Sequence, residues 1–262
     1  MTDHAARLRS AWDAELDGLS GRFSLALTAD GVAVSRDPDV PHYAASTMKL
    51  AVLGALTPAR TTTSVTVHAE FPSAAGGLFT LQQADDQDDW TWARLGQEVD
   101  LDVLATRMIT VSSNIATDLL LELIGIDAVH DYLAGQGLEA ITVERLIGDA
   151  AGQERGFTNT VTAAGLAALL TTLAGDDHAL DLLSRQTHLD MIPAGLPAGT
   201  WSASKGGWVT GVKNDVALVR PTDAPEYVLA VCTTTEESDA DGMALVARLS
   251  AVTWEHWNRW HA

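Results

Sequence analysis

A run of apolar residues that covers every face of a helix is the feature that most constrains this chain. Residues 46–56 read STMKLAVLGAL, and their apolar side chains form no stripe. A helix that is apolar all round is buried, so the run predicts a central helix packed on every side. Lys49 nevertheless lies in its first turn, three residues after Ser46. A buried ammonium group is costly unless it is paired or has a chemical task, so Lys49 is the first candidate functional residue.

The composition of the chain excludes several kinds of partner. Its 262 residues are 47% hydrophobic, enough for one large core or two lobes, and the formal net charge is −19. Such an acidic chain is a poor partner for nucleic acid or anionic lipid. No apolar run is long enough to cross a bilayer, and residues 1–19 are charged and amphipathic rather than a signal peptide. We therefore expect a cytoplasmic protein with no membrane partner.

The order of the predicted elements favours one antiparallel sheet made from both ends of the chain. A helix over residues 2–19 precedes a hairpin centred on Ala29-Asp30-Gly31. Strands follow near the C-terminus, in 200–209, 211–221 and 226–235, before a helix over 239–260. The middle is helical, with helices between Asp100 and Gly125, broken at Ser112-Ser113, and over 127–136, 162–174 and 176–191.

This order predicts an α+β fold, in which a five-stranded antiparallel sheet flanked by helices lies beside an all-helical lobe. No repeat or linker separates independent domains. We expect a single domain over residues 1–262, with an α/β lobe of about 1–58 and 192–262 and a helical lobe of about 59–191.

Ser46 and Lys49 have the spacing of an activated serine. Residues i and i+3 are neighbours on one face of a helix, and the N–H groups at a helix N-terminus stabilise anions. A nearby amine can then take the hydroxyl proton while a backbone N–H binds the oxyanion. The alternative is that Ser46 or Thr47 only caps the helix, and that Lys49 extends to the surface.

Two further motifs argue against that alternative. Ser112-Ser113-Asn114 falls at a predicted helix break, and Lys205-Gly206-Gly207 falls in a predicted strand. In this order, S-x-x-K, S-x-N and K-G-G resemble the three motifs of class A β-lactamases and penicillin-binding proteins. The resemblance is to the class A branch, and it covers nearly the whole chain.

The resemblance implies a catalytic set of Ser46, Lys49, Ser112 and Lys205. Ser46 would be the acylated nucleophile, Lys49 its base or proton relay, and Ser112 a carrier of the proton to the leaving group. Lys205 would add positive potential that keeps Lys49 poised. The substrate-binding residues would be Asn114, which orients the substrate amide, Gly207, Trp208, whose N–H joins that of Ser46 in an oxyanion hole, and Lys213, which anchors a substrate carboxylate. No metal or other cofactor is implied.

Four features depart from the class A pattern. Residues 142–165, where an omega loop is expected, lack the E-x-x-x-N pattern that directs the deacylating water. Their acids, Glu144, Asp149 and Glu154, are read as ordinary solvated loop charges. Gly206 stands where K-T-G has a hydroxyl residue, Trp208 is expected to place an indole beside the oxyanion position, and no export signal is present.

Three functions remain open. The first is a serine hydrolase or acyl transferase that forms an acyl-enzyme on Ser46 with a small amide, ester or lactam, and turns over β-lactams poorly. The second is a true class A-type β-lactamase with a non-standard deacylation base. The third is a non-catalytic binding domain for β-lactams or peptides, which would have no need of a buried lysine. We expect a small-molecule substrate and a monomer.

Overall fold

The computed structural model describes residues 2–29, 31–56 and 63–261. The chain forms two compact units, one of Met1–Thr47 with Val161–Ala262 and the other of Met48–Thr160. The predicted lobes have other bounds. Residues 161–191, assigned to the helical lobe, belong to the unit that contains the sheet, and residues 48–56, assigned to the α/β lobe, belong to the other unit. The predicted bound at residues 58–59 itself lies outside the described residues. We describe each unit by itself and call them the sheet unit and the helical unit.

The sheet unit contains a five-stranded antiparallel sheet in the order β2-β1-β11-β10-β9, which confirms the predicted fold class. Its strands are β1 (Gly21–Ala29), β2 (Val32–Arg36), β9 (Trp201–Val209), β10 (Val212–Arg220) and β11 (Tyr227–Thr235). Residue 30, at the tip of the predicted hairpin, lies outside the described residues. Both faces of the central strands are buried, because helices cover the sheet on both sides.

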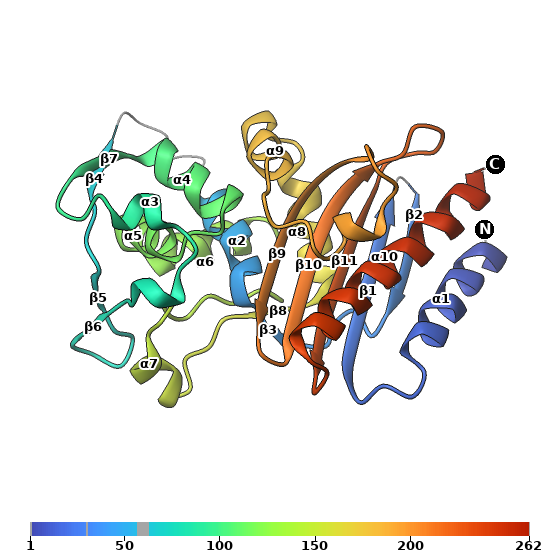
Figure 1. The fold of residues 1–262 in the computed structure, drawn as a ribbon, viewed down its shortest axis with the longest axis horizontal. Helices are drawn as coiled ribbons and strands as arrows, with labels where there is room; N and C mark the ends of the chain where they lie inside the picture. The colour runs from blue at the N-terminus through green and yellow to red at the C-terminus, as the bar shows by residue number, and fades with distance from the viewer. Residues whose placement is uncertain (1, 30, 57–62, 262) are drawn as a thin grey trace. The chain divides into compact units, whose positions relative to one another are not determined.

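The helices of the sheet unit form two layers around these strands. Helices α1 (Thr2–Leu16) and α10 (Asp239–His261) run side by side along one face of the sheet (Figure 1). Helix α8 (Ala163–Leu173) packs on β1, β10 and β11, and α9 (Asp177–Ser184) packs on β9. Short elements complete the unit: β3 (His42–Tyr43) and η4 (Pro193–Gly195), with η1 (Ala45–Met48) and β8 (Thr160–Val161) at its bounds.

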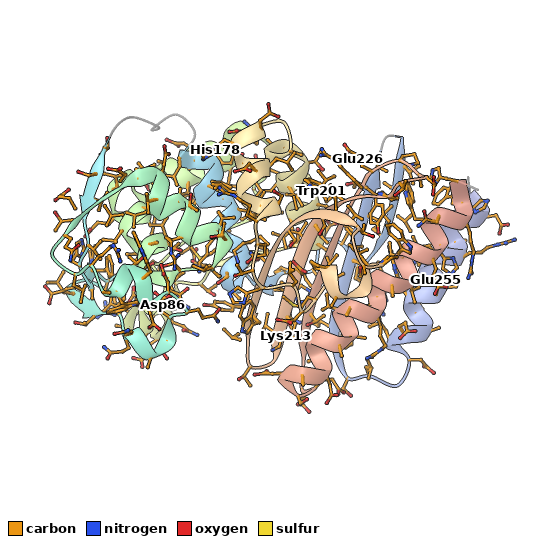
Figure 2. All side chains as sticks on the ribbon, turned by 45° about the horizontal axis from the view of Figure 1, so that its top comes forward. Asp86, His178, Trp201, Lys213, Glu226 and Glu255 are labelled. Atoms are coloured by element: carbon orange, nitrogen blue, oxygen red, sulfur yellow. The ribbon has the colours of Figure 1, made fainter. Side chains whose placement is uncertain are left out.

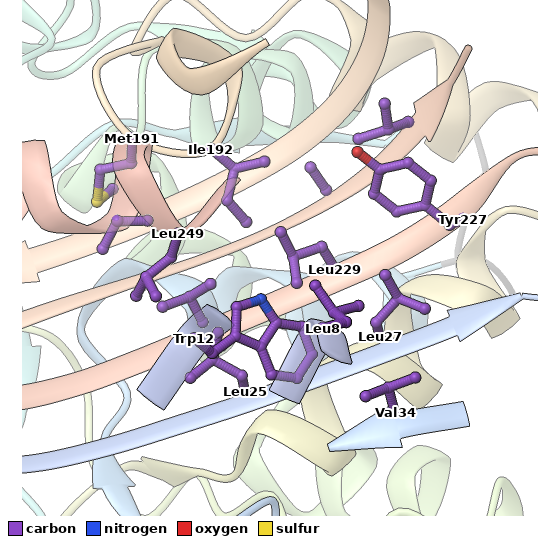
Figure 3. Close-up of a cluster of buried hydrophobic side chains, with 14 of the residues drawn as sticks. Leu8, Trp12, Leu25, Leu27, Val34, Met191, Ile192, Tyr227, Leu229 and Leu249 are labelled. Carbon is purple, nitrogen blue, oxygen red and sulfur yellow. The ribbon is translucent and has the colours of Figure 1, made fainter. Parts of the chain in front are cut away.

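A hydrophobic core fills the space between the sheet and helices α1 and α10. Trp12 of α1 lies among Leu25, Leu229 and Leu249 (Figure 3). Its indole N–H donates to Thr253 Oγ1 at 2.8 Å, and that of Trp257 donates to Pro225 O at 2.9 Å. Each tryptophan therefore adds a large apolar area to the core without leaving a buried donor unpaired.

The helical unit surrounds the apolar helix that the sequence predicts. All eight residues of α2 (Lys49–Leu56) are buried, and α2 packs against α4, α5 and α6. A Cβ on Gly54 would lie 2.3 Å from the ring of Tyr132, so the close approach of α6 requires glycine there. The unit also contains α3 (Asp89–Trp92), α4 (Leu101–Thr110), α5 (Asn114–Ile124), α6 (Ile126–Gly135), α7 (Ala150–Glu154), η3 (Gln83–Asp85) and the strand pairs β4 (Ser64–Thr66) with β7 (Glu98–Asp100) and β5 (Glu70–Pro72) with β6 (Leu78–Thr80).

Three local predictions need correction. Ser46 lies in the 3₁₀ turn η1 and not in the first turn of an α-helix. Helix α9 ends at Ser184 instead of residue 191, because Gln186 Oε1 accepts from the N–H groups of Thr187 and His188 and so competes with helical bonding. The short strand pairs between residues 64 and 100 carry no alternating signal long enough to predict.

Within the described ranges, no helix combines the length and the apolarity that a membrane crossing requires.

Candidate active site

Ser46 follows a strained backbone position in the sheet unit. Ala45 has a φ of 46°, in the left-handed region that non-glycine residues rarely adopt. Strand β10 holds the segment that precedes Ser46. Asn214 Nδ2 donates to Tyr43 O at 2.8 Å, and Asn214 Oδ1 accepts from Thr233 N. Asn214 thus joins the sheet to the segment that presents Ser46. The sequence analysis did not single out this residue, since only the fold brings it to residue 43.

Strand β9 approaches the Ser46 turn most closely at Gly207. A Cβ on Gly207 would lie 2.6 Å from both Ser46 N and Thr47 N. Backbone atoms cannot move aside as a flexible side chain can, so this position requires glycine. The predicted motif residue Gly207 therefore lets the main chain of β9 lie against the N–H groups of the Ser46 turn.

Lys205 on β9 and Asp215 on β10 are two buried ionisable groups of the sheet unit whose charges act on each other. Lys205 Nζ donates to Gly206 O at 2.7 Å, and Asp215 Oδ2 accepts from Ile192 N at 2.8 Å. Burial lowers the pKa of Lys205 to about 7, although the charge of Asp215 acts to raise it. Burial also raises the pKa of Asp215 to about 7, against the opposing effects of the Ile192 N–H and Lys205. Both groups can therefore change charge near neutral pH.

Trp208 does not place its indole where the sequence predicts. Successive side chains of a strand alternate between its faces, so Trp208 points away from the face of Lys205 and Gly207. Its indole packs against the hydrophobic core of the sheet unit and meets the ring of His188 edge-on at 5.0 Å between centroids. The expectation of an indole beside the oxyanion position is corrected, and only the backbone N–H of Trp208 stays a candidate donor.

Lys213 has a structural role in place of the predicted carboxylate anchor. It pairs with Trp208 across the strands, near the β9–β10 turn and at the opposite end of this strand pair from Trp201 (Figure 2). The Lys213 side chain is 2% exposed, and its Nζ donates to Asp239 Oδ1 at 2.9 Å and to Val209 O at 2.7 Å. Asp239, at the start of α10, already occupies the Lys213 ammonium group, so we assign Lys213 no role as a carboxylate anchor.

Lys49, Ser112 and Asn114 lie together in the helical unit. Lys49 Nζ donates to Ser112 O at 2.6 Å and to Asn114 Oδ1 at 2.8 Å, and Ser112 Oγ lies 3.2 Å away. Lys49 is fully buried. Ser112 has a φ of 58°, so this residue too is held in the left-handed region. The structure thus brings together three residues that two separate motifs supply.

Asp86 fixes the helix that carries Asn114. Its carboxylate accepts from Asn114 N at 2.9 Å, Ile115 N at 2.8 Å and Trp92 Nε1 at 3.0 Å. A carboxylate at a helix N-terminus satisfies free N–H groups and interacts well with the helix dipole. The sequence shows only a cluster of acids over residues 82–90, and nothing in it pairs one of them with α5.

The three acids of the loop over residues 137–160 have different environments. Glu144 Oε2 accepts from Thr158 N at 2.7 Å, and Glu154 is exposed at the end of α7. Asp149 is fully buried, contrary to the prediction of a solvated charge. It caps α7 through Gly152 N and accepts from Ser73 Oγ and Ala74 N, each at 2.8 Å. The hydrogen bonds of its carboxylate therefore join the loop to the segment at Ser73 and Ala74.

Asp118 is a buried acid that the sequence analysis missed. It lies on α5 one turn after Asn114, is fully buried, and accepts from Ile147 N at 2.9 Å through Oδ1. Among the described residues its Oδ2 has no hydrogen-bond partner. Burial raises the pKa of Asp118 well above its usual range, although the Ile147 N–H and the charge of Lys49 act against it. The available signal was an acid among the apolar residues of NIATDLLLELI, a run that also contains Glu122.

In the part of the chain that the structure describes, no group of three or more histidine, cysteine, aspartate or glutamate side chains gathers as metal ligands do. The fold and the three motifs together define a class of protein, the serine hydrolases of the β-lactamase and transpeptidase type.

The comparisons with known proteins agree with this class. The model of the beta-lactamase enzyme family matches residues 8–257. A β-lactamase of Bacillus licheniformis is 27% identical over 252 residues, which cover 92% of this chain and 78% of that protein. The structure of a β-lactamase from Xanthomonas campestris is similar with a TM-score of 0.82 at 22% identity, covering 96% of this chain and 98% of that one. The structure of PBP-A is similar with a TM-score of 0.80 at 20% identity, covering 97% of this chain and 96% of that one.

The chain therefore belongs to the beta-lactamase enzyme family and is a serine hydrolase of the β-lactamase-like superfamily.

Proposed function

We propose that the protein cleaves or transfers an acyl group from a small amide, ester or lactam through an acyl-enzyme on Ser46. Ser46 Oγ would attack the substrate carbonyl as its proton passes to Lys49 Nζ, which must enter this step as the neutral amine. The proton would then travel through Ser112 Oγ to the departing nitrogen or oxygen as its bond to the carbonyl carbon breaks. Water, or another acceptor, would release the acyl group and regenerate the Ser46 hydroxyl.

The arrangement around Lys49 is the observation that carries this proposal. A fully buried lysine donates to Ser112 O and Asn114 Oδ1, with the hydroxyl of Ser112 at 3.2 Å. These contacts fix the Lys49 amine at the start of α2. Ser46 lies three residues earlier, in the 3₁₀ turn η1 that leads directly into α2. A side chain that only anchored the fold would not need a neighbouring hydroxyl, whereas a proton relay does.

The sheet unit supplies the remaining groups. Gly207 lets β9 lie against the Ser46 turn, and we assign the backbone N–H groups of Ser46 and Trp208 to the developing oxyanion. Lys205 would add positive potential, and Asn114, in the helical unit, would orient the substrate amide. The cytoplasmic location and the monomeric state stay predictions.

Slow release of β-lactam acyl groups follows from the environment of the loop acids. A deacylating water needs a carboxylate that is free to accept its proton, and such assistance is worth about 10²–10⁴-fold. Glu144 accepts a hydrogen bond from Thr158 N, and Asp149 caps α7. Glu154, the last residue of α7, is exposed to solvent. An opened β-lactam also keeps its amine attached, where it shields the carbonyl from water, whereas the alcohol of a small ester departs.

The test is time-resolved intact-protein mass spectrometry with a reactive β-lactam and with small p-nitrophenyl esters. We expect one equivalent of β-lactam adduct that persists, several turnovers with some of the esters, and neither in Ser46→Ala. An adduct that persists unchanged in Ser46→Ala would remove Ser46 as the nucleophile.

The second candidate function is a β-lactamase with a different deacylation base, and the 27% identity to a curated β-lactamase favours it. Rapid β-lactam turnover without an accumulated adduct would establish it over the first. Single variants of Glu144, Asp149 and Glu154 would then identify the base. The third function, binding without catalysis, predicts that Ser46 is acylated slowly or not at all and that no substrate is turned over.

A further inference from the structure

Asp118 is an unusual residue to keep inside the helical unit. Its side chain is fully buried, one carboxyl oxygen accepts from Ile147 N, and the other has no hydrogen-bond partner among the described residues. An unpaired buried polar atom costs about 1–3 kcal/mol. An asparagine could accept the same Ile147 N–H, so holding the loop does not explain why an ionisable group is present.

The groups that face Asp118 come from three parts of the unit. Lys49 at the start of α2 and Arg145 of the 137–160 loop favour its ionised form, while Asp86, before α3, opposes it. Arg145 is directed to Leu146 O and Gln153 Oε1, each at 3.1 Å. Lys49 donates to Asn114 Oδ1, and Asn114 and Asp118 lie one turn apart on the same face of α5. Asp118 is thus a buried acid next to the group that binds the Lys49 amine.

We propose that Asp118 and Lys49 form one buried acid–base unit, in which the charge of the Asp118 carboxyl sets how readily Lys49 gives up and takes a proton. Asp118 is a positioning residue, because it acts through Lys49 and not on the substrate. A carboxylate at this position favours the ammonium form of Lys49, and a neutral carboxyl favours the amine that can accept the Ser46 proton. No bond to Asp118 is made or broken. The inference rests on the proposed function of Lys49.

The direction of the effect follows from this coupling. In the wild type, ionisation of Asp118 as pH rises would hold Lys49 as the ammonium to higher pH. In Asp118→Asn this counter-charge is gone, so Lys49 becomes the neutral amine at lower pH. In a plot of acylation rate against pH, the part where the rate rises (the rising limb) should therefore move to lower pH. For an interacting pair of buried charges, we expect a move of about one pH unit or more.

The first test compares Asp118→Asn with Asp149→Asn. Asp149 is a matched control, because it is also fully buried and also faces Arg145, but Lys49 is not among the charges that act on it. Single-turnover acylation of Ser46 is measured by mass spectrometry from pH 5 to 10. We expect the limb to move only in Asp118→Asn. A limb that stays in place in Asp118→Asn, or moves equally in both variants, would overturn the inference.

A second readout does not depend on activity. The ¹³C signal of the Asp118 carboxyl is followed by NMR against pH in the wild type and in Lys49→Met. Without the ammonium group, Asp118 should ionise at higher pH in Lys49→Met than in the wild type. An unchanged midpoint would reject the coupling, and this measurement decides the matter even if Asp118→Asn fails to fold. If the wild type forms no Ser46 adduct at any pH, the proposed function fails while this readout still tests the acid–base unit.

Discussion

Each unit buries one lysine from a predicted motif, and the two lysines are held in different ways. In the helical unit, Lys49 Nζ donates to a backbone carbonyl and to a side-chain amide oxygen, with a hydroxyl beside it. In the sheet unit, Lys205 Nζ donates to the carbonyl of its own strand, and the charge of Asp215 acts on it. The surroundings of Lys49 thus include a hydroxyl that can exchange a proton, whereas Lys205 is influenced by the charge of Asp215.

The two units also each bury an aspartate with one carboxyl oxygen that lacks a hydrogen-bond partner in the described residues. These are Asp118 on α5 and Asp215 on β10, and each accepts a backbone N–H through its other oxygen. In both, burial raises the pKa of the carboxyl, so neither is a fixed counter-charge. In both units, the charges of the buried acid and of the lysine act on each other.

Exchanging each lysine for arginine tests this contrast most severely. Arginine keeps the positive charge but cannot accept a proton, so Lys49→Arg should lose acylation by on the order of 10³-fold or more, nearly as much as Lys49→Ala. Lys205→Arg should lose less, because a charge is what we assign to that position. The measurement is the rate of Ser46 adduct formation. Near wild-type activity in Lys49→Arg would show that charge alone matters at position 49 and would remove the contrast between the two lysines.

Adding one methyl group to β9 has the next largest expected effect. Gly207→Ala would place a Cβ 2.6 Å from Ser46 N and Thr47 N and push the strand from the Ser46 turn. A displacement of about 1 Å at a reacting group can cost about 10²-fold in rate, and we expect a loss of that size. Gly206→Ala is the control, because its Cβ would clash only with the flexible end of Met191, also at 2.6 Å, and would make ordinary contacts with Asp215 Oδ1 and Asn214 O. Equal rates in the two variants would contradict the assigned role of Gly207.

Removing the charge of Asp215 should change the titration of Lys205. Asp215→Asn keeps an acceptor for Ile192 N but removes the group that raises the pKa of Lys205. The pKa of Lys205 should then fall below its present value of about 7, which ¹³C NMR of the labelled lysine Cε atom measures. With only three lysines in the chain, the signal is readily assigned. A midpoint that stays at its wild-type value would mean that Asp215 does not act on Lys205.

The smallest effect concerns a buried group to which we assign no part in the reaction. Burial lowers the pKa of His42 to about 4, and its ring nitrogens contact Ser24 Oγ at 2.9 Å and Thr234 Oγ1 at 2.8 Å. Between pH 6.5 and 4 the unfolded chain takes up a proton on this residue and the folded chain does not. The free energy of unfolding should therefore fall as pH falls through this window.

His42→Gln should remove this part of the pH dependence and leave the acylation profile unchanged. Urea unfolding at several pH values measures the first effect, and Ser46 adduct formation measures the second. A slope that is the same in His42→Gln as in the wild type would assign the pH dependence of stability to other groups.

Much of this protein could be predicted from local patterns in its sequence. Apart from Lys49, the residues up to Leu56 are apolar on every face of the helix. They form a buried helix because none of its faces is polar enough to lie in solvent. Alternating runs at both chain ends form the five strands, since their period matches the pleat. The motifs at Ser46, Ser112 and Lys205 were recognised because their residue types and order resemble those of class A β-lactamases and penicillin-binding proteins.

Other features were decided only by the tertiary structure. The register of β9 on β10 sets Lys213 opposite Trp208, and the position of α10 gives it Asp239 as a partner. The burial of Asp118 depends on a loop that joins α5 only after folding, through Ile147 N, 29 residues away in sequence. Spacing within one helix or strand determines which side chains share a face, and the sequence therefore identified the motifs. The partners of a buried charge come from segments far apart in sequence, so only the packed fold determined which groups surround each buried lysine and each buried acid.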